Sequence, residues 1–248
     1  MIIIPDIHGR TFWKDVVKGN EDKEIVFLGD YLDPYIFDEE VTREGAIENF
    51  KEIIEFKKQH MDNVILLLGN HDFIKYIYDD MKECRTDFVN MPRIKDIFRG
   101  NKHLFHVGYY KKLKYKTFIF THAAFLKKWV DEAHRYLSEF KTPEEIIDFL
   151  NDIYITDPDL LCDLLNRSHW YFRGGWYQAG SPIWGDLREC SEKRAQYKRY
   201  YNIFGHTQLK DEPIIGKYIA CLDCRRGFIL DEETKQIKEM NGEVCKKI

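Results

Sequence analysis

The sequence places side chains that can bind metal ions or transfer protons directly after several apolar segments. The clearest case is Gly69-Asn70-His71-Asp72, which follows the apolar run 63–68. A run of strand-forming residues stopped by glycine predicts a buried strand that carries chemistry at its C-terminal end. Three further segments repeat this design: Asp6-Ile7-His8-Gly9, Gly29-Asp30-Tyr31-Leu32-Asp33 and Gly205-His206-Thr207.

Six side chains at these strand ends form a candidate metal site. They are Asp6, His8, Asp30, Asn70, His122 and His206. Mixed carboxylate, amide and imidazole ligands suit manganese, iron or zinc better than calcium. Six ligands are too many for one ion with open positions, but they fit two ions about 3.5–4 Å apart with a bridging carboxylate. Each residue alone could instead cap a loop, and it is their joint placement that favours a dinuclear site.

The elements that must position these side chains alternate between strands and helices. Residues 2–4 are apolar and β-branched, and in 24–28 four apolar residues follow Glu24, which predicts buried strands. Apolar residues recur at helical spacing over 39–60, before the strand at 63–68. This order predicts a βαβ unit with parallel strands. On an extended backbone after the first strand, Asp6 and His8 would point the same way.

The later part of the chain continues the alternation. Residues 123–177 are helical and aromatic, and Thr142-Pro143-Glu144-Glu145 has the form of a helix start. The strand at 117–121 delivers His122. The other expected elements are helices over 73–84 and 191–201 and strands over 103–107, 218–222 and 227–230, the last two completing the sheet.

Composition indicates one folded domain over residues 1–248, with a mostly helical, aromatic insertion or cap around 123–180. Hydrophobic residues make up 44% of the chain and aromatic residues 15%, which is enough for a substantial core. The net charge of −4 argues against a general nucleic-acid footprint. The basic stretch 111–116 leaves a nucleic-acid partner possible, but a solvated turn between strands explains it more simply.

Cysteines and hydropathy indicate a soluble, cytoplasmic protein. Only Cys221 and Cys224 have metal-type spacing, and no second pair completes a zinc site, so reduced thiols are expected. The apolar run 1–4 is too short for a signal peptide. No segment approaches about 18 consecutive apolar residues, the length that a membrane span needs.

The motifs between residues 6 and 207 resemble those of calcineurin-like metallophosphoesterases, most closely the serine/threonine phosphoprotein phosphatase branch. The resemblance implies an α/β fold, a four-layer α-β-β-α sandwich of two mixed sheets flanked by helices. It also implies that Asp6 and His8 bind a first metal ion and that Asp30 bridges to a second. The remaining ligands of the second ion would be Asn70, His122 and His206.

The same resemblance implies that His71 is a general acid and that Asp33 orients it. The chemistry supports these roles, because a phosphoester has a poor alkoxide leaving group that needs a proton. A carboxylate partner would raise the pKa of the imidazole and keep it charged. His71 adjoins the ligand Asn70 but would point away from it on an extended backbone.

The chain departs from the phosphatase branch at several positions. Pro5 replaces a glycine, Asp72 replaces a glutamate, and Ala123-Ala124 replaces a glycine pair. Pro34 stands where the branch usually has a phosphate-binding arginine. A guanidinium can bind phosphate from several geometries. The candidate substitutes are Arg188, which is the first choice, and Arg173, Arg10 and Arg225.

These observations predict a phosphoester hydrolase that uses two divalent metal ions. The leading hypothesis is a phosphomonoesterase of serine/threonine phosphatase type, acting on a phosphorylated protein or a small phosphorylated metabolite. One alternative is a nucleotide phosphodiesterase or dinucleoside polyphosphate hydrolase, with aromatic residues near 170–184 stacking on a base. Another is a catalytically silent metal-binding scaffold, against which the presence of His71 and Asp33 argues.

Overall fold

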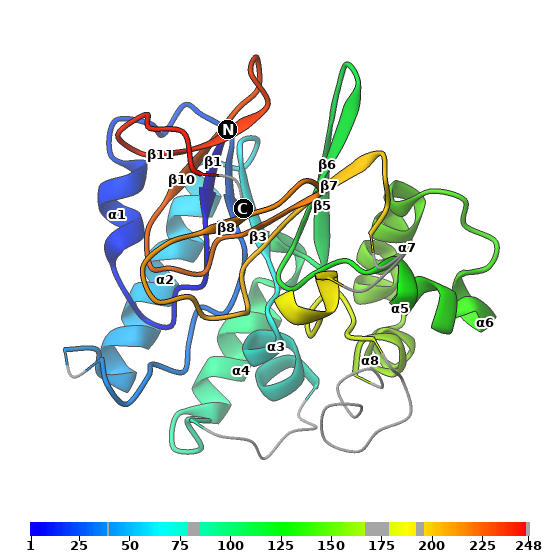
Figure 1. Cartoon of the computed structure of the whole chain (residues 1–248). Helices are drawn as coiled ribbons and strands as arrows, with labels where there is room; N and C mark the ends of the chain where they lie inside the picture. The colour runs from blue at the N-terminus through cyan, green and yellow to red at the C-terminus, as the bar shows by residue number, and fades with distance from the viewer. Residues whose placement is uncertain (39, 79–84, 167–178, 192–195, 247–248) are drawn as a thin grey trace. The chain divides into compact units, whose positions relative to one another are not determined.

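The computed structural model describes residues 1–38, 40–78, 85–166, 179–191 and 196–246. The chain forms two compact units. Unit 1 comprises Met1–Phe105 and Arg225–Val244, and unit 2 comprises His106–Cys224 and Cys245–Ile248. Strands of the chain form two mixed sheets flanked by helices (Figure 1), which confirms the expected α/β class. Among the residues described, no helix is long and apolar enough to span a lipid bilayer.

The first sheet has the strand order β11-β10-β1-β2-β3-β4. β1 pairs in parallel with β2 and β2 with β3, so that Val26 lies between Ile3 and Ile65. All residues of these three strands are buried, as their unbroken apolar sequences predict. The strands are β1 (Ile2–Ile4), β2 (Ile25–Phe27), β3 (Val64–Leu67), β4 (Phe105–His106), β10 (Phe228–Asp231) and β11 (Gln236–Glu239).

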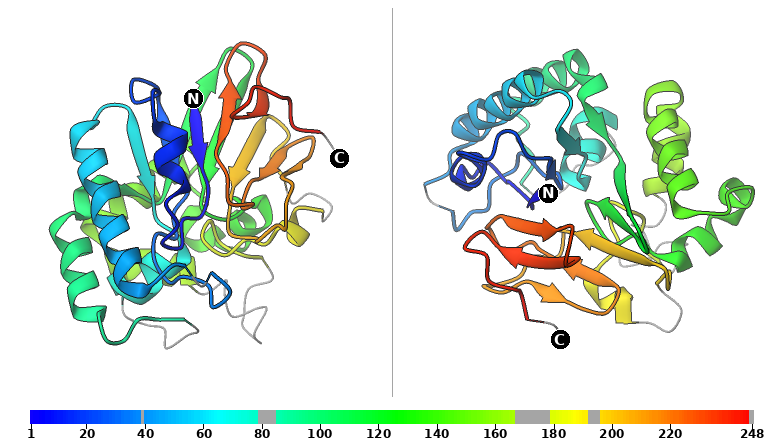
Figure 2. Two further views of the ribbon diagram at one scale, coloured as in Figure 1. Left: turned by 90° about the vertical axis from the view of Figure 1, so that its left-hand side faces the viewer. Right: turned by 90° about the horizontal axis from the view of Figure 1, so that it is seen from above.

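Helices α1 (Phe12–Val17) and α2 (Arg43–Gln59) lie side by side along this sheet (Figure 2). Trp13 of α1 contacts Phe27 of β2 and Phe56 of α2, with ring centroids 5.8 and 5.6 Å apart. The predicted helix between the second and third strands is therefore confirmed. Its packing fixes β2, the strand after which Asp30 and Asp33 follow.

The helix expected over 73–84 begins earlier and is wound differently. It starts as α3 (Asn70–Asp72) and continues as the π-helix η1 (Phe73–Tyr78), while 79–84 lie outside the described residues. Gly69, in extended conformation, donates its N–H to the Asp72 carboxylate at 2.9 Å and so caps α3. The expectation that His71 stands on an extended backbone is wrong, because this cap starts the helix before it.

Two other elements complete unit 1. Helix α4 (Met91–Gly100) is followed by the 3-10 helix η2 (Lys102–Leu104). The strand expected over 103–107 is confirmed only at β4. Its first part is helical, because the Leu104 N–H bonds the Asn101 carbonyl at 2.9 Å and closes a local turn.

The second sheet has the order β5-β6-β7-β9-β8, and β6, β7 and β9 are parallel. Phe120 of β6 lies opposite Ile203 of β7, so both strands end at the same edge, where His122 and His206 follow. The strands are β5 (Gly108–Leu113), β6 (Lys116–Thr121), β7 (Tyr200–Phe204), β8 (Ile214–Ile215) and β9 (Ile219–Cys221).

The helical region of unit 2 includes the predicted helix start at Thr142. Thr142 Oγ1 accepts a hydrogen bond from the Glu145 N–H, and the Glu145 carboxylate accepts one from the Thr142 N–H, each at 3.3 Å. Helix α7 packs against β5. Residues 167–178, with most of the aromatic stretch, lie outside the described residues. The described helices are α5 (Lys127–Glu132), α6 (His134–Leu137), α7 (Pro143–Thr156), α8 (Pro158–Asn166) and the 3-10 helix η4 (Leu187–Ser191).

Two expectations about the C-terminal third are wrong. The described part of 191–201 contains no helix beyond Ser191; Tyr200 and Tyr201 begin β7, opposite Thr117 and Phe118 of β6. Aromatic side chains pair well across strands, and that contact overrides local helical tendency. The last two predicted strands also do not share a sheet, because β9 pairs with β7 and β10 pairs with β1.

Candidate active site

The loops after β1 and β2 hold three site residues in left-handed backbone conformation. The φ angles are 45° for His8, 52° for Asp30 and 60° for Asp33. Such angles are uncommon outside glycine, although Asp and His tolerate them better than most residues. The extended geometry expected from Asp6 to His8 is therefore wrong. Backbone N–H groups of Ile7 and His8 bond the Asp30 carbonyl at 3.1 and 2.7 Å, which holds the two loops together.

Two glycines allow the loops after β2 and β3 to touch. A Cβ atom on Gly29, whose φ is 104°, would lie 2.5 Å from the Gly69 nitrogen. A Cβ atom on Gly69 would collide with Asp30 Oδ1. Because both clashes involve backbone or a buried carboxylate, neither position accepts a side chain without displacing Asp30.

Asp72 joins these two loops from inside the protein. Its carboxylate accepts hydrogen bonds from the backbone N–H groups of Gly69 at 2.9 Å, Asp30 at 2.7 Å and Tyr31 at 3.1 Å. Burial and the nearby Asp30 charge raise the pKa of Asp72, whereas the three N–H donors oppose that rise. Asp72 is fully buried. We therefore assign it a structural role at the position where the phosphatase branch usually has glutamate.

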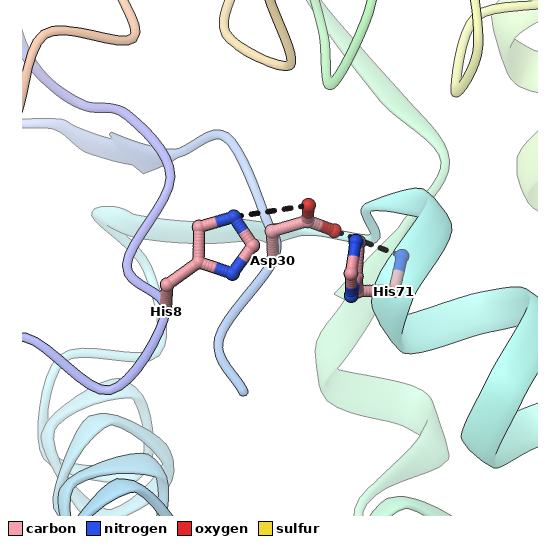
Figure 3. Close-up of side chains that lie close together, drawn as sticks. All are labelled: His8, Asp30 and His71. Carbon is pink, nitrogen blue, oxygen red and sulfur yellow. Dashed lines mark hydrogen bonds and ion pairs between the residues drawn. The ribbon is translucent and has the colours of Figure 1, made fainter. Parts of the chain in front are cut away.

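His8, Asp30 and His71 come together at the edge of the unit 1 sheet where β1, β2 and β3 end (Figure 3). One ligand-capable atom of each lies within 4.8 Å of the others. His8 Nδ1 lies 2.9 Å from the Leu32 carbonyl, so Nε2, 3.5 Å from Asp30 Oδ2, is the nitrogen left for a metal. Burial lowers the pKa of His8 and favours the neutral imidazole, the form that binds metal ions.

His71 is held by Asp33 inside a buried network. Its Nδ1 lies 2.7 Å from Asp33 Oδ2, and because a carboxylate only accepts, the ring donates Nδ1–H. Lys75 Nζ donates to the same oxygen at 2.6 Å and lies 2.8 Å from His71 Nδ1. The Tyr76 hydroxyl donates to Asp33 Oδ1. The consecutive residues Lys75 and Tyr76 both reach Asp33 from the π-helix, whose wider turn is typical of functional sites.

The Asp33 carboxylate stays charged in this network. Burial alone would raise its pKa, but hydrogen bonds and charges from His71 and Lys75 outweigh burial and hold the pKa below its usual value. Arg85 closes the other side of the network: its Nη1 donates to the Asp33 carbonyl at 2.8 Å, and its Nη2 lies 3.1 Å from His71 Nε2. Asp33 thus bonds His71 and Lys75 through its carboxylate and Arg85 through its backbone carbonyl.

Asp6 and Asn70 are also buried within unit 1. Asp6 follows β1, and Asn70 is the first residue of α3. Each therefore stands at the carboxyl end of a parallel strand, as the sequence predicts. Asn70 does so from a helix start, where its backbone carbonyl accepts a bond from the Phe73 N–H.

In unit 2, His122 and His206 face each other. His206 Nδ1 lies 3.2 Å from His122 Nε2, and the rings stand edge to face with centroids 5.1 Å apart. His206 has a φ of 60°, and Trp184 packs against its ring. The Gly205 N–H bonds the His122 carbonyl at 2.8 Å and ties the ends of β6 and β7 together.

The alanine pair after His122 is fully accommodated. The Ala123 and Ala124 N–H groups bond the carbonyls of Pro182 and Gly185 at 2.8 and 2.9 Å. Both alanine side chains are buried, and Gly185 supplies the space, because a Cβ atom there would collide with the Ala124 carbonyl oxygen. Replacing the branch's glycine pair is therefore compatible with this loop.

The donor spacings fit metal ions within each unit. Two nitrogen ligands of one ion, each about 2.0–2.1 Å from it, lie roughly 2.9–3.4 Å apart. The His122–His206 separation of 3.2 Å falls in that range, and the 3.5 Å between His8 Nε2 and Asp30 Oδ2 lies just beyond it. Buried imidazole and carboxylate donors are the chemistry that manganese, iron and zinc accept.

The arginines proposed from sequence lie in different surroundings. Arg10 pairs with Asp38 through Nε at 2.8 Å, and Arg225 lies 3.9 Å from the same carboxylate. Arg188 is 79% exposed and bonds Asp186 at 2.8 Å. Arg173 lies outside the described residues.

Sequence reasoning missed four residues of the site: Asp72 as a loop anchor, and Lys75, Tyr76 and Arg85. Lys75 follows His71 by four residues, a spacing that brings side chains together only on a helix that includes both, and the helix was expected to begin at Phe73. Arg85 carried no such signal, because neither periodicity nor a motif links it to His71.

Comparison with known proteins gives one family match and several similar structures. Residues 2–210 match the family described as calcineurin-like phosphoesterase. No curated protein matches the chain significantly. The cold-active protein-tyrosine phosphatase of a psychrophilic Shewanella species has a similar structure, with a TM-score of 0.59 and 16% identity, over 99% of this chain and 80% of that one. A mutant of a cold-active protein tyrosine phosphatase gives 0.60 and 15% over the same shares.

The structural similarity supports the fold, and the sequence match covers most of the chain, including all the motifs from Asp6 to His206. Candidate metal-binding residues are present in unit 1. The chain belongs to the calcineurin-like phosphoesterase family and is a metal-dependent phosphoester hydrolase.

Proposed function

We propose that this hydrolase is a phosphomonoesterase that uses two divalent metal ions and a histidine general acid. The observation that carries the proposal is the buried His71–Asp33 pair, with 2.7 Å between Nδ1 and Oδ2. A metal-binding scaffold needs no proton donor. Here Lys75 and Tyr76 both bond Asp33, the carboxylate that orients the proposed donor His71.

Six residues would hold the ions. His8 and Asp30 present close, buried donors in unit 1, and His122 and His206 do so in unit 2. Asp6 and Asn70 complete the set, with Asp30 as the bridging carboxylate. Bound ions, whether manganese, iron or zinc, would offset the charge of the phosphoryl oxygens and make a water molecule nucleophilic at neutral pH.

His71 would supply the proton for the leaving group. With Nδ1–H donated to Asp33, Nε2 is the ring atom that faces the reacting group. Transfer of a proton from Nε2 to the ester oxygen converts an alkoxide into an alcohol, and the ring remains bonded to Asp33 through Nδ1. Positioned acids of this kind contribute about 10²- to 10⁴-fold in rate.

A monoester substrate suits the positive charge around His71. Lys75 and Arg85 both lie within 3.1 Å of its ring nitrogens. A dianionic monoester gains more from such charge than a monoanionic diester does. The similar Shewanella structure is that of a protein-tyrosine phosphatase, so phosphotyrosine belongs beside phosphoserine, phosphothreonine and small metabolites as a candidate substrate.

A substrate panel tests the proposal. The full chain, supplied with manganese, is compared on p-nitrophenyl phosphate, its bis-ester, phosphopeptides and a dinucleoside tetraphosphate. We expect the monoesters to be hydrolysed fastest; faster cleavage of the bis-ester or the tetraphosphate would favour the diesterase alternative. A large loss of turnover on phosphoserine peptides in His71→Ala, with unchanged metal content, supports the acid role. His103→Ala, at an exposed position, is the matched control.

A further inference from the structure

Arg85 occupies the place where a substrate-binding arginine is needed. Pro34 removes the arginine that the phosphatase branch usually carries directly after Asp33. Arg85 approaches the same point from another part of the chain, because its Nη1 donates to the Asp33 carbonyl at 2.8 Å. The guanidinium therefore lies beside the peptide group that links Asp33 to Pro34.

The backbone around Arg85 is fixed by buried contacts. Arg85 has a φ of 68°, and the next two residues, Thr86 and Asp87, are buried. The Asp87 N–H donates at 3.2 Å to the Tyr76 hydroxyl, the same hydroxyl that donates to Asp33. The Asp87 carboxylate also bonds the backbone and side chain of Asn90 at 3.1 and 2.8 Å. Arg85 is thus anchored to the network that holds the proton donor.

The guanidinium itself is oriented on three sides. Besides the Asp33 carbonyl, its Nη2 lies 3.1 Å from His71 Nε2, and its carbon lies 3.8 Å from the centre of the Tyr35 ring. The Tyr35 ring also meets the His8 ring edge to face at 4.6 Å. Stacking on an aromatic ring leaves the edge of a guanidinium available for bidentate hydrogen bonds.

His71 Nε2 is the atom that must face the leaving oxygen in the proposed reaction. A group 3.1 Å from that atom can also reach oxygens on the phosphorus to which the leaving oxygen is bonded. An arginine N–H only donates, and phosphoryl oxygens are acceptors that a guanidinium can bind through two N–H groups.

We propose that Arg85 is the phosphate-binding residue of this site and that it donates to non-bridging oxygens of the phosphoryl group. This inference rests on the proposed function and deepens it. Substrate binding moves Nη2 from His71 Nε2 to the phosphoryl group. Arg10 and Arg225 instead lie against Asp38, and Arg188 bonds Asp186 at the surface.

Kinetics and product inhibition of the manganese-loaded chain test this role. For Arg85→Ala we expect kcat/KM on p-nitrophenyl phosphate to fall about 10- to 100-fold, because a hydrogen bond to a charged group is lost. The inhibition constant of inorganic phosphate should rise by a similar factor, with metal content unchanged. Arg85→Lys keeps the positive charge but loses the bidentate guanidinium, so both constants should lie between those of the wild type and Arg85→Ala. Arg99→Ala, a side chain 76% exposed on α4, is the control.

A purely structural role for Arg85 would give a different result. In that case kcat falls while the inhibition constant of phosphate stays at the wild-type value, which would overturn the inference. Arg85→Lys carries the test if the alanine variant unfolds. Phosphate binding can also be measured directly by calorimetry. If the wild type binds phosphate but turns over no ester, the proposed function fails, and weaker binding by the Arg85 variants still supports this site.

Discussion

The two units of the chain hold their histidines in opposite ways. In unit 1, His8 and His71 each have Nδ1 directed at a single oxygen acceptor, the Leu32 carbonyl and the Asp33 carboxylate. In unit 2, nitrogens of His122 and His206 lie 3.2 Å from each other. Both arrangements stand at the carboxyl ends of parallel strands. The unit 1 arrangement suits the separate roles that we propose, metal binding for His8 and proton donation for His71. The unit 2 pair is suited to one shared ion.

Several side chains hold the unit 1 network in place. Lys75 and Tyr76 both bond the Asp33 side chain, and Arg85 bonds its carbonyl. These bonds fix the position of Asp33 beside the His71 ring. The unit 2 pair is set by the strands it follows and by the Gly205–His122 backbone bond. We expect metal binding to depend on both regions, and proton transfer to depend on unit 1.

Substitution of Asp30 should have the largest effect. Its carboxylate accepts a hydrogen bond from the backbone N–H of His71 at 2.9 Å and lies beside His8. Asp30→Ala therefore removes the proposed bridging ligand and disturbs the position of His71, the proposed general acid. We expect about a thousandfold loss of rate or more, from several kcal/mol of lost charge stabilisation. Elemental analysis should show less bound metal. Full metal content together with near-normal turnover would contradict the role, and Asp96→Ala, at an exposed site, is the control.

The unit 2 pair should behave as one ligand set. His122→Ala and His206→Ala should each lower the metal content by about one ion and the rate by roughly 10²-fold. Because both residues serve the same ion, the double variant should be little worse than either single one. Rate losses that multiply in the double variant would show that the two histidines act independently.

Asp72→Ala should destabilise unit 1 rather than change its chemistry directly. The change leaves three buried N–H groups, of Gly69, Asp30 and Tyr31, without their acceptor. We expect the free energy of unfolding to fall by about 2–4 kcal/mol. Urea unfolding of the metal-free protein measures it without linkage to ion binding. Thr42→Ala, which removes an exposed helix cap, should cost about 1 kcal/mol and gives the scale.

Tyr76→Phe should have the smallest effect and shows how redundant the unit 1 network is. The change removes one donor from Asp33, while Lys75 and His71 still bond its other oxygen. We expect a loss of stability of about 0.5–1.5 kcal/mol and a rate loss below about tenfold. Tyr110→Phe, which breaks an exposed bond to Asp148, should have less effect on stability. A hundredfold loss of rate for Tyr76→Phe would show that Asp33 has no such reserve.

Much of the fold could be predicted because its strands have simple sequences. β1, β2 and β3 are unbroken apolar runs, and α2 has a clear apolar face, so the βαβ order followed directly. The positions of Asp30 and His122 after their strands followed as well. The start of β7 did not, because Tyr200 and Tyr201 lie in a basic, aromatic stretch and pair with β6 only through long-range contacts.

The local geometry of the site could not be predicted in the same way. The left-handed φ angles of His8 and Asp30 follow from packing between loops, not from local preference. The early start of α3 depends on the Asp72 bond to Gly69. Arg85 contacts His71 from a segment in which the Asp87 N–H bonds the Tyr76 hydroxyl. The loop packing and the Arg85–His71 contact depend on residues distant in the sequence, so patterns of spacing do not reveal them.

The dependence of the His71→Ala rate on the leaving group tests the central claim most directly. The wild type and the variant are compared on a series of phosphate monoesters, from p-nitrophenol to simple alcohols, at equal metal content. If His71 protonates the leaving oxygen, the variant should lose little with p-nitrophenol and up to about 10⁴-fold with alcohols. An equal loss across the whole series would contradict the account, because it would show that His71 does not donate the leaving-group proton.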